Sequence, residues 1–313
     1  FFSSRRRHTR FRNVTGVQTC ALPIWRRARV PELPEVETVR RGLERHVVGR
    51  VVTRVEVGRE RSVRRTGRAA VVDGLTGTRV TAARRRGKYL VCELDSGDAL
   101  MVHLRMSGRL LVAPAGAPRP PHTHVVLHLA PRRGAGATHE LRFVDPRTFG
   151  EVVVFDPAHA EREVPDLAGL GPDPIVDGLD PAGLRRVLGA RRGRIKAVLL
   201  DQRAIAGIGN IYADEILHRA RLRPDRPADR VRGAALARLH AAIVGVLRDA
   251  IEDGGSTLED TQYVDLEGAT GGYQLQHRVY GRAGERCVTC GRGRVRTMSV
   301  ASRTSHWCGV CQR

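Results

Sequence analysis

The sequence has almost no lysine. Only Lys88 and Lys196 are lysines among its 54 basic residues, and all the others are arginines. Heavy use of arginine, alanine and glycine is typical of a GC-rich bacterial genome. A lysine that persists against this bias is a candidate for a role that needs a compact point charge, which a planar guanidinium does not replace. Survival by chance is the alternative explanation for each lysine.

The chain also lacks long apolar runs. None approaches the ~18–20 residues that a membrane-spanning helix needs, so no span is expected. The longest apolar stretch near the start, residues 21–25, contains a proline and is shorter than the roughly 7–15 residues of a secretory signal core. We therefore expect a bacterial protein of the cytoplasm.

Residues 1–30 differ from the rest of the chain. They contain eight arginines but no lysine and no acidic residue. Residues 14–24 resemble the in-frame translation of a common sequencing adapter, so we expect residues 1–30 to lie outside the functional protein. A transit peptide or a basic nucleic-acid-binding arm would have a similar composition. Val30 is encodable by a GTG start codon, and removal of the resulting methionine would leave Pro31 with a free amine.

The remaining chain is strongly basic. The formal net charge is +21, and +13 remains without the eight arginines of residues 1–30. Such an excess favours a polyanionic partner, most simply nucleic acid, because neutralised phosphates release their counterions. A generally basic protein without such a partner is the alternative. The 283 residues from Pro31 onward suffice for two domains with separate cores.

The cysteines form one strong motif. Of the six, Cys20 lies in the first 30 residues, and Cys92 lies in a strand-like apolar run that predicts burial. The other four form two Cys-x2-Cys pairs separated by 17 residues: Cys287, Cys290, Cys308 and Cys311. This spacing is typical of a structural zinc site. Disulfides and an iron–sulfur cluster are the alternatives, and the absence of a secretion signal disfavours disulfides.

The apolar periodicity predicts an α+β architecture. A helix is expected at 35–49, followed by many short strands, which indicate a β-sandwich or barrel. A segment rich in proline, glycine and aspartate at 164–180 is expected to be a linker before a helical part. The expected strands are 51–57, 78–83, 89–94, 100–104, 109–112, 124–129, 140–144 and 152–155, and the later helices are 181–188, 195–200, 210–220, 234–253 and 257–260.

A Gly-x-Gly turn precedes the helix expected at 210–220. Gly207 and Gly209 allow a tight turn with free backbone N–H groups, which is a possible phosphate site. A plain connection between two helices is the alternative, and Asn210 suits the start of the helix in both cases.

The motifs together resemble one family. The chain is similar, in order and over its whole length from Pro31, to formamidopyrimidine-DNA glycosylases, which form a superfamily with endonuclease VIII. This resemblance implies an N-terminal β-sandwich domain at 31–164, a linker at 165–180, a helix–two-turn–helix DNA-binding domain at 181–278 and a zinc finger at 279–313. The motifs that carry it are PELPEVETVRRGL (31–43), RRRGKYL (84–90), HLRMSGRL (103–110), DPRTFG (145–150), LGPDP (170–174), GIGNIYADEIL (207–217) and VYGRAGERC (279–287).

The resemblance implies a catalytic set. Pro31 would be the Schiff-base nucleophile through its amine, and Glu32 the general acid/base beside it. Lys88 and Arg303 would contact phosphate close to the lesion, as would His103. As an ordinary internal residue, Pro31 would instead be a proline at the entry to a strand, since its nitrogen would then be an amide.

The resemblance also implies DNA-binding residues. Met106, Arg147 and Phe149 would fill the gap left by the extruded base, which offsets part of the few kcal/mol that base flipping costs; core packing or a surface charge is the alternative. Lys196 and Asn210 would contact the DNA backbone. The segment 263–273 would close over the flipped base with Tyr273, although Gly272-Tyr273-Gln274 departs from the Gly-Tyr-Phe common in the family. Thr148 replaces a basic residue of some members.

The expected activity is that of a monomeric bifunctional DNA glycosylase and abasic-site lyase. It would excise 8-oxoguanine and formamidopyrimidines from double-stranded DNA, with one structural zinc ion. The alternatives are an endonuclease VIII-like glycosylase for oxidised pyrimidines, and a non-catalytic damaged-DNA-binding protein if residues 1–30 are retained.

Overall fold

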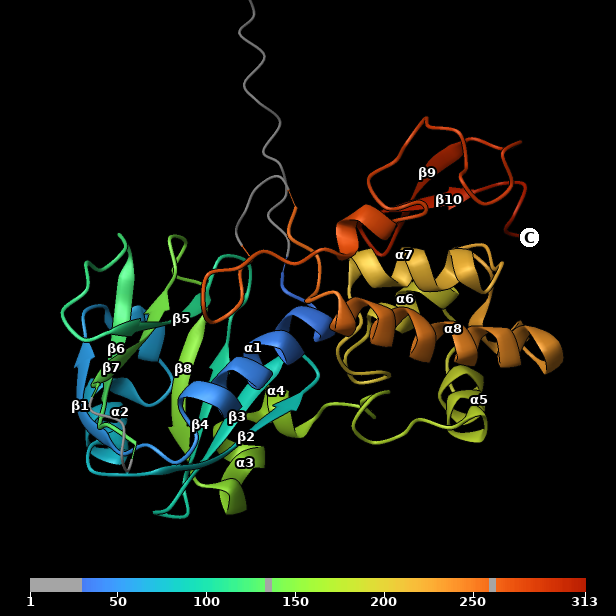
Figure 1. Ribbon diagram of the computed structural model, residues 1–313. Coiled ribbons are helices and arrows are strands. Elements are labelled where there is room, and N and C mark those ends of the chain that lie inside the picture. The colour runs from blue at the N-terminus through green and yellow to red at the C-terminus, as the bar shows by residue number, and fades with distance from the viewer. Residues whose placement is uncertain (1–29, 133–136, 259–262) are drawn as a thin grey trace, which may run out of the picture.

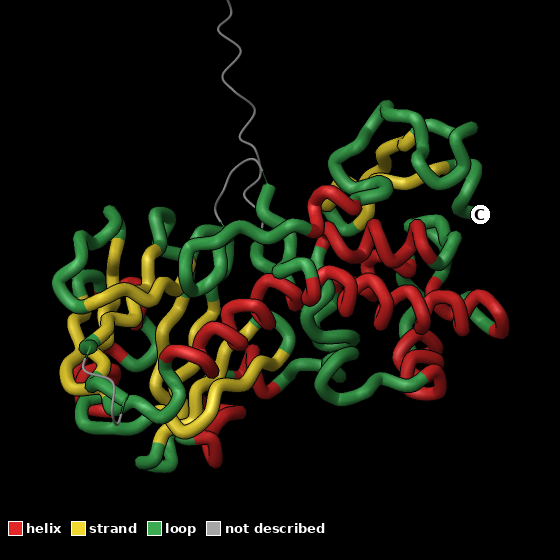
Figure 2. Tube along the Cα trace, in the orientation of Figure 1, coloured by secondary structure: helices red, strands yellow, loops and turns green. Residues whose placement is uncertain are grey.

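The computed structural model describes residues 30–132, 137–258 and 263–313. It confirms an α+β architecture with a β-rich half, a helical half and a small two-stranded unit near the C-terminus (Figures 1 and 2). Apart from Val30, the segment 1–30 lies outside the described residues. No helix in the described ranges is long and apolar enough to cross a membrane.

Two four-stranded antiparallel sheets form the β domain, as expected for a sandwich. The core between them is made of the inward-facing apolar residues of the strands, such as Val52, Val55 and Val57 of β1. Strands β4 and β8 are buried along their whole length, because a second apolar cluster around Met101 and Phe155 covers their other face. In sheet order, the strands are β1 (Val52–Val57), β6 (Thr123–Leu129), β7 (His139–Val144) and β5 (Arg109–Pro114), then β2 (Val80–Arg86), β3 (Tyr89–Leu94), β4 (Ala99–His103) and β8 (Glu151–Phe155).

Helix α1 (Leu33–His46) connects the two halves of the molecule. Its first residue, Leu33, belongs to the core of the helical domain, whereas Val36, Val39 and Leu43 belong to the core of the β domain. The helix contacts both β2 and α8, and Figure 1 shows it crossing from one half to the other. Pro34 near its N-terminus and a capping box between Glu32 and Glu35 fix where it begins.

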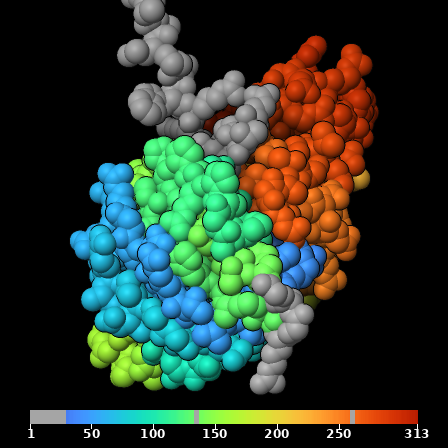
Figure 3. Space-filling view, turned by 60° about the vertical axis from the view of Figure 1, so that its left-hand side comes forward, coloured from blue at the N-terminus to red at the C-terminus, as the bar shows by residue number. Residues whose placement is uncertain are grey.

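The helical domain surrounds a core of leucine, isoleucine and alanine residues. Its longest helix, α8, has the apolar spacing of an amphipathic helix, with Leu236, Leu239, Ile243, Val246 and Leu247 on the buried face. The zinc-finger region follows as an antiparallel hairpin, β9 (Val295–Val300) and β10 (Arg303–Cys308), placed beside the helical domain (Figure 3). The helices are α5 (Pro181–Gly189), α6 (Ile195–Leu200), α7 (Asn210–Arg219) and α8 (Gly233–Glu252), with single 3-10 turns η3 (Ala228–Arg230) and η4 (Tyr273–Gln276).

The structure differs from the expected elements in several places. The sequence prediction missed a nine-residue helix, α2 (Gly67–Leu75), which packs on β1 and β8. The expected linker begins with a short helix, α4 (Pro165–Ala168). The helix expected at 257–260 is wrong for residues 257 and 258, which have no regular structure; the other two lie outside the described residues. The other short elements are η1 (Glu60–Val63), η2 (Pro157–His159) and α3 (Ala160–Glu163).

Candidate active site

Glu32 binds the N-terminus of helix α7. It follows the buried Pro31 directly, and its own side chain is only 3% exposed. The backbone N–H groups of Gly209 and Ile211 donate hydrogen bonds to its carboxylate over 2.7 and 2.9 Å, and that of Tyr212 donates over 3.3 Å. The positive end of the helix dipole thus faces a carboxylate of the protein itself.

This arrangement decides between the two interpretations of the Gly-x-Gly turn. The free N–H groups are occupied by Glu32, so the turn serves as a carboxylate site within the protein. A Cβ on Gly209 would lie 2.3 Å from Cδ of Glu32, and one on Gly207, which has a φ of +92°, would lie 2.6 Å from a methyl of Leu33. Both glycines are therefore needed for the close approach of α1 to α7.

The surroundings of Glu32 tune its acidity. Burial raises the pKa of its carboxyl to about 7, although the charge of Lys88 and the helix N–H groups favour the ionised form. A carboxyl with such a pKa exchanges protons readily near neutral pH, which is what a general acid/base requires.

Glu35 supports Glu32 from one helical turn away. Its carboxylate accepts a hydrogen bond from the backbone N–H of Glu32 over 2.9 Å and another from that of Ser256 over 2.7 Å. The hydroxyl of Tyr212 also donates to it. Burial raises the pKa of the Glu35 carboxyl against these donors. The sequence placed this acid near the site but gave it no role.

Replacing Gly209 with alanine is expected to destabilise the protein by about 1–3 kcal/mol, the usual cost of overpacking. The added methyl has no room beside the Glu32 carboxylate, so either the carboxylate leaves the helix terminus or α7 shifts. Urea denaturation measures the change. Gly189→Ala in α5 is the matched control, since no atom lies within 4 Å of its added Cβ, and it should be neutral or stabilising. Equal effects of the two substitutions would contradict this account.

Lys88 and Arg303 approach the site from different domains. Lys88 is a partly buried residue in the turn between β2 and β3, and the exposed Arg303 begins β10 in the finger hairpin. Burial lowers the pKa of the Lys88 amine, Glu32 and Glu35 oppose this effect, and Arg303 adds to it. The structure therefore brings the β-hairpin lysine into the electrostatic range of both the Glu32 carboxyl and the finger arginine.

His103 lies at the end of β4 and is 5% exposed. Burial, Arg105 and Lys88 lower the pKa of its imidazole well below the usual value, so the ring is neutral. Its Nδ1 accepts a hydrogen bond from the backbone N–H of Arg105 over 2.9 Å, which leaves the proton on Nε2. The ring packs edge-on against Tyr89. In this tautomer it can donate to an anionic oxygen through Nε2.

Met106, Arg147 and Phe149, which are expected to fill the gap left by the extruded base, lie on two loops. One buried carboxylate joins these loops. Asp145 accepts hydrogen bonds from the hydroxyl of Ser107 and from the backbone N–H groups of Arg147 and Gly150. Ser107 directly follows Met106, so Asp145 joins the loop that carries Met106 to the loop that carries Arg147 and Phe149. Ser107 and Asp145 occur in the motifs quoted above, but only the structure shows this connection.

The side chains of Met106, Arg147 and Phe149 are at least partly exposed to solvent. Arg147 is exposed and stacks over the ring of Phe149 at 5.2 Å from its centroid, and Phe149 is 36% exposed. Met106 is partly buried. Exposure of a large aromatic ring in a rigidly held loop favours a contact role over core packing for Phe149.

Lys196 has a different environment from the one expected. Its side chain is 0% exposed, and its amine lies 2.7 Å from Oδ1 of Asp214 and donates to the carbonyl of Thr304 over 3.1 Å. The Nδ2 group of Asn210 donates to the same carbonyl over 3.1 Å. Both residues therefore fix the backbone directly after Arg303. Because Lys196 is buried, it cannot contact DNA in this conformation.

Tyr273 is also buried, at 2% exposure. Its ring packs against those of Tyr212 and His277, with centroids 5.8 and 5.7 Å away. The side chain therefore belongs to the core of the helical domain and supports the segment 263–273 from inside; residues 259–262 lie outside the described ranges. In this conformation the Tyr273 side chain is not available for the expected contact with DNA.

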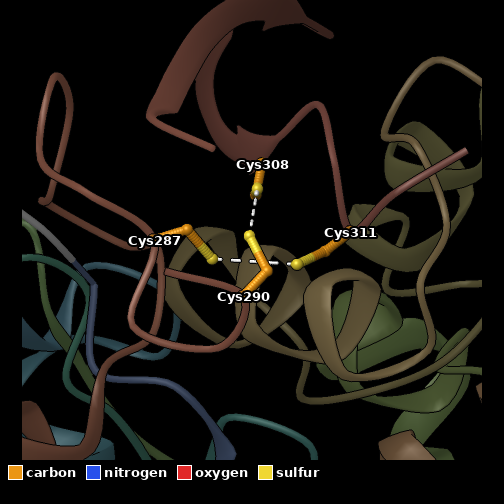
Figure 4. A group of neighbouring side chains, drawn as sticks. All are labelled: Cys287, Cys290, Cys308 and Cys311. Atoms are coloured by element: carbon orange, nitrogen blue, oxygen red, sulfur yellow. Dashed lines mark hydrogen bonds between the residues drawn. The ribbon is translucent and has the colours of Figure 1, made fainter. Parts of the chain in front are cut away.

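The four cysteines of the finger converge on one point (Figure 4). Their sulfur atoms all lie within 4.8 Å of one another, and the Cys287–Cys311 and Cys290–Cys308 pairs are each 3.8 Å apart. A disulfide requires about 2.05 Å, so these pairs are not disulfides. Four sulfurs about 2.3 Å from a tetrahedral zinc ion lie about 3.8 Å apart. The residues therefore fit zinc.

Two acidic residues of α7 attach the finger to the helical domain. The carboxylate of Glu215 accepts hydrogen bonds from the backbone N–H groups of Arg278, Val279 and Tyr280 over 2.8–3.0 Å. Neighbouring Asp214 accepts one from the N–H of His306 over 2.8 Å.

Comparisons with known proteins agree with this site. Two family models match: the formamidopyrimidine-DNA glycosylase N-terminal domain at residues 30–152 and the formamidopyrimidine-DNA glycosylase H2TH domain at 170–262. A formamidopyrimidine-DNA glycosylase of Nocardioides sp. is 45% identical, over 90% of this chain and 94% of the relative. One of Desulforamulus reducens is 40% identical, over 91% and 99%.

Solved structures agree as well. The Lactococcus lactis Fpg in complex with an abasic-site-containing DNA is 35% identical, with a TM-score of 0.80 over 90% of this chain and 99% of that one. A mutant of the same protein with a Fapy-dG-containing DNA has a TM-score of 0.80 at 36% identity, over 90% and 100%. The chain therefore belongs to the formamidopyrimidine-DNA glycosylase family of damaged-DNA repair enzymes.

Proposed function

We propose that this DNA glycosylase excises oxidised purines, 8-oxoguanine and formamidopyrimidines, from duplex DNA and then cleaves the resulting abasic site. The observation that carries the proposal is Glu32, a buried carboxyl with a pKa of about 7, held at the α7 terminus directly after Pro31. Lys88 adds positive charge beside it, and Arg303 lies within electrostatic range of Lys88. The relatives with DNA containing an abasic site or Fapy-dG support this substrate class.

The chemistry requires a free amine on Pro31. In the chain as printed, its nitrogen is bonded to Val30 and is an amide. We therefore propose that the active protein begins at Pro31, without residues 1–30. The secondary amine then attacks C1′ of the flipped nucleotide while Glu32 protonates the ring oxygen and the sugar opens. The glycosidic bond breaks next, and the base leaves with that electron pair and with the proton that the amine gave up, so that an iminium forms between Pro31 and C1′.

The proposed second stage cleaves the strand. The iminium between Pro31 and C1′ acidifies the C2′ proton. Loss of this proton expels the 3′ phosphate by β-elimination, and a further proton loss expels the 5′ phosphate by δ-elimination. Water then hydrolyses the iminium and restores the amine.

The remaining residues have positioning roles in this proposal. His103, Lys88 and Arg303 bind phosphates, while Met106, Arg147 and Phe149 occupy the space of the flipped base. Asn210 orients the finger. A structural zinc ion held by Cys287, Cys290, Cys308 and Cys311 would supply much of the folding free energy of the finger. The partner is damaged duplex DNA, bound by a monomer.

Borohydride trapping tests the nucleophile. A protein that begins at Pro31, verified by intact mass, is expected to form a covalent adduct with abasic-site DNA, because borohydride reduces the iminium to a stable amine. A matched protein with one alanine before Pro31 should give none. Failure of the free-Pro31 protein to trap would overturn the Schiff-base mechanism and favour a non-catalytic damage-binding role. Equal trapping by both proteins would assign the reaction to another amine.

The same trapping experiment identifies the lesion class. Duplexes with 8-oxoguanine are expected to be trapped faster than duplexes with thymine glycol, since the comparisons place the chain with formamidopyrimidine-DNA glycosylases. Preference for thymine glycol would support the endonuclease VIII-like alternative instead.

A further inference from the structure

A buried ion pair, unused in the mechanism above, holds the hairpin tip that carries Lys88. Arg85, near the end of β2, and Asp173, in the linker, pair directly, and both side chains are 0% exposed. Burying two charges carries a large desolvation penalty, which is offset only by close pairing and additional hydrogen bonds. The additional contacts of this pair show what it holds in place.

Asp173 binds the turn directly before Lys88. Its Oδ2 accepts a hydrogen bond from the backbone N–H of Gly87 over 2.9 Å. Its Oδ1 accepts from the backbone N–H groups of Ile175 and Val176 over 2.9 and 3.1 Å, which fixes the linker around it. Burial acts to raise the pKa of the Asp173 carboxyl, but Arg85 and these donors lower it, so the carboxylate stays ionised.

Arg85 binds the same turn from its other side and extends to α1. Its Nη1 donates to the carbonyl of Gly87 over 3.1 Å, and its Nε donates to Oε2 of Glu37 over 2.9 Å. Both backbone polar groups of Gly87 are therefore held by the ion pair. The helix that begins beside Glu32 is connected to the same pair through Glu37.

The turn also packs against the segment that binds Glu32. A Cβ added to Gly87, which has a φ of +55°, would lie 3.0 Å from Cβ of Ala206 and 3.2 Å from the nitrogen of Gly207. The carbonyl of Gly207 in turn accepts a hydrogen bond from the backbone N–H of Leu33 over 3.0 Å. The hairpin tip thus has little freedom to move relative to the start of α1.

From these contacts we infer that Asp173 and Arg85 are positioning residues that fix the Lys88 amine relative to the Glu32 carboxyl across the boundary between the two domains. Neither touches the substrate; both act through the backbone of Gly87. The linker is in this way part of the active-site framework. The effect on excision rate rests on the proposed role of Lys88, whereas the positioning itself does not.

Lysine NMR tests the positioning directly. A chain that begins at Pro31 contains two lysines, so ¹³C labelling at Cε gives two signals, and Lys88→Arg assigns them. Asp173→Asn keeps the shape but removes the charge opposite Arg85. We expect the tip to loosen and the Lys88 pKa to rise toward the ordinary value of about 10.4, by at least about 0.5 unit, as the amine gains water. The signal of the enclosed Lys196 should not move.

Kinetics complete the test. The excision kcat of Asp173→Asn is expected to fall about 10-fold, while the Kd for a duplex with a non-cleavable tetrahydrofuran abasic site changes less than about 2-fold. Glu93→Gln is the matched control, because it breaks an exposed arginine–carboxylate pair on the same hairpin, 2.5 Å between Nε of Arg84 and Oε1 of Glu93, and should change neither quantity.

The outcomes separate the two proposals. An unchanged Lys88 titration in folded Asp173→Asn would overturn the positioning role, whatever the rate. A shifted Lys88 titration with an unchanged rate would leave the positioning role and overturn the proposed function of Lys88. If Asp173→Asn does not fold, Asp177→Ala removes the acceptor of the Asp173 N–H, 2.8 Å away, and should shift Lys88 in the same direction by less; no shift there would also overturn the inference.

Discussion

Replacing Glu32 with glutamine is expected to slow base excision by about 10²–10⁴-fold, the range for loss of a general acid/base. The amide is almost the same size as the carboxyl, but it cannot deliver a proton to the sugar. Single-turnover excision from an 8-oxoguanine duplex measures the loss. Binding to a tetrahydrofuran duplex should stay within a few-fold, because Glu32 is buried and contacts the α7 terminus.

The pH profile gives a sharper form of this prediction. Protonation of the ring oxygen needs the protonated carboxyl, whose pKa is raised to about 7 by burial. The rate should therefore contain a limb that falls as pH rises above about 7, and this limb should be missing in Glu32→Gln. Glu44→Gln, at an exposed position on the same helix, should retain wild-type rate and profile. A Glu32→Gln protein within about 3-fold of the wild-type rate would exclude Glu32 as the acid.

Removal of zinc is expected to unfold the finger and to weaken binding to damaged duplex DNA by at least about 10-fold. The finger hairpin is short, and metal binding supplies roughly 10–16 kcal/mol in isolated zinc fingers. Arg303 lies in that hairpin, so its expected phosphate contact is lost with it. Mass spectrometry under native conditions should show one zinc ion per chain before chelation and none after it.

Trp307 provides a local signal for this unfolding. In a chain that begins at Pro31 it is the only tryptophan; its ring is 8% exposed, with the guanidinium of Arg223 stacked at 4.9 Å. Its fluorescence should shift to the red on chelation, while far-UV circular dichroism keeps the β-domain signal. Cys308→Ser should behave like the chelated protein, and Cys92→Ser should keep its zinc. Full DNA affinity without metal would refute the structural role of the finger.

The β-strands and the metal site were the parts most predictable from sequence. Most strands of the β domain are short apolar runs between turn residues, and paired thiolates at this spacing have few other uses; β9 and β10, which are largely polar, were not predicted. Helix α2 was missed because Gly67–Leu75 begins with a glycine and has no strong apolar period. Residues 257 and 258 follow the end of α8 without continuing as helix.

The site was only partly predictable because its key contacts join distant segments. A Gly-x-Gly turn with free N–H groups looks the same in sequence whether it binds a phosphate or a carboxylate, and 177 residues separate Gly209 from Glu32. Burial of Lys196 could not be foreseen without its partner Asp214 and the carbonyl of Thr304. A likeness to a family assigns roles to positions, but it does not state which side chains are enclosed.

Helix α1 has a mechanical consequence for the whole molecule. Its first residue packs in the core of the helical domain, and its later turns pack in the core of the β domain. The helix therefore holds the two domains in a fixed position relative to each other. The two domains cannot move apart about the linker unless part of α1 leaves one of these two cores. We therefore expect the protein to change little in shape when it binds damaged DNA, so that any bending needed for a fit falls on the DNA, at a cost that depends on how easily its base steps deform.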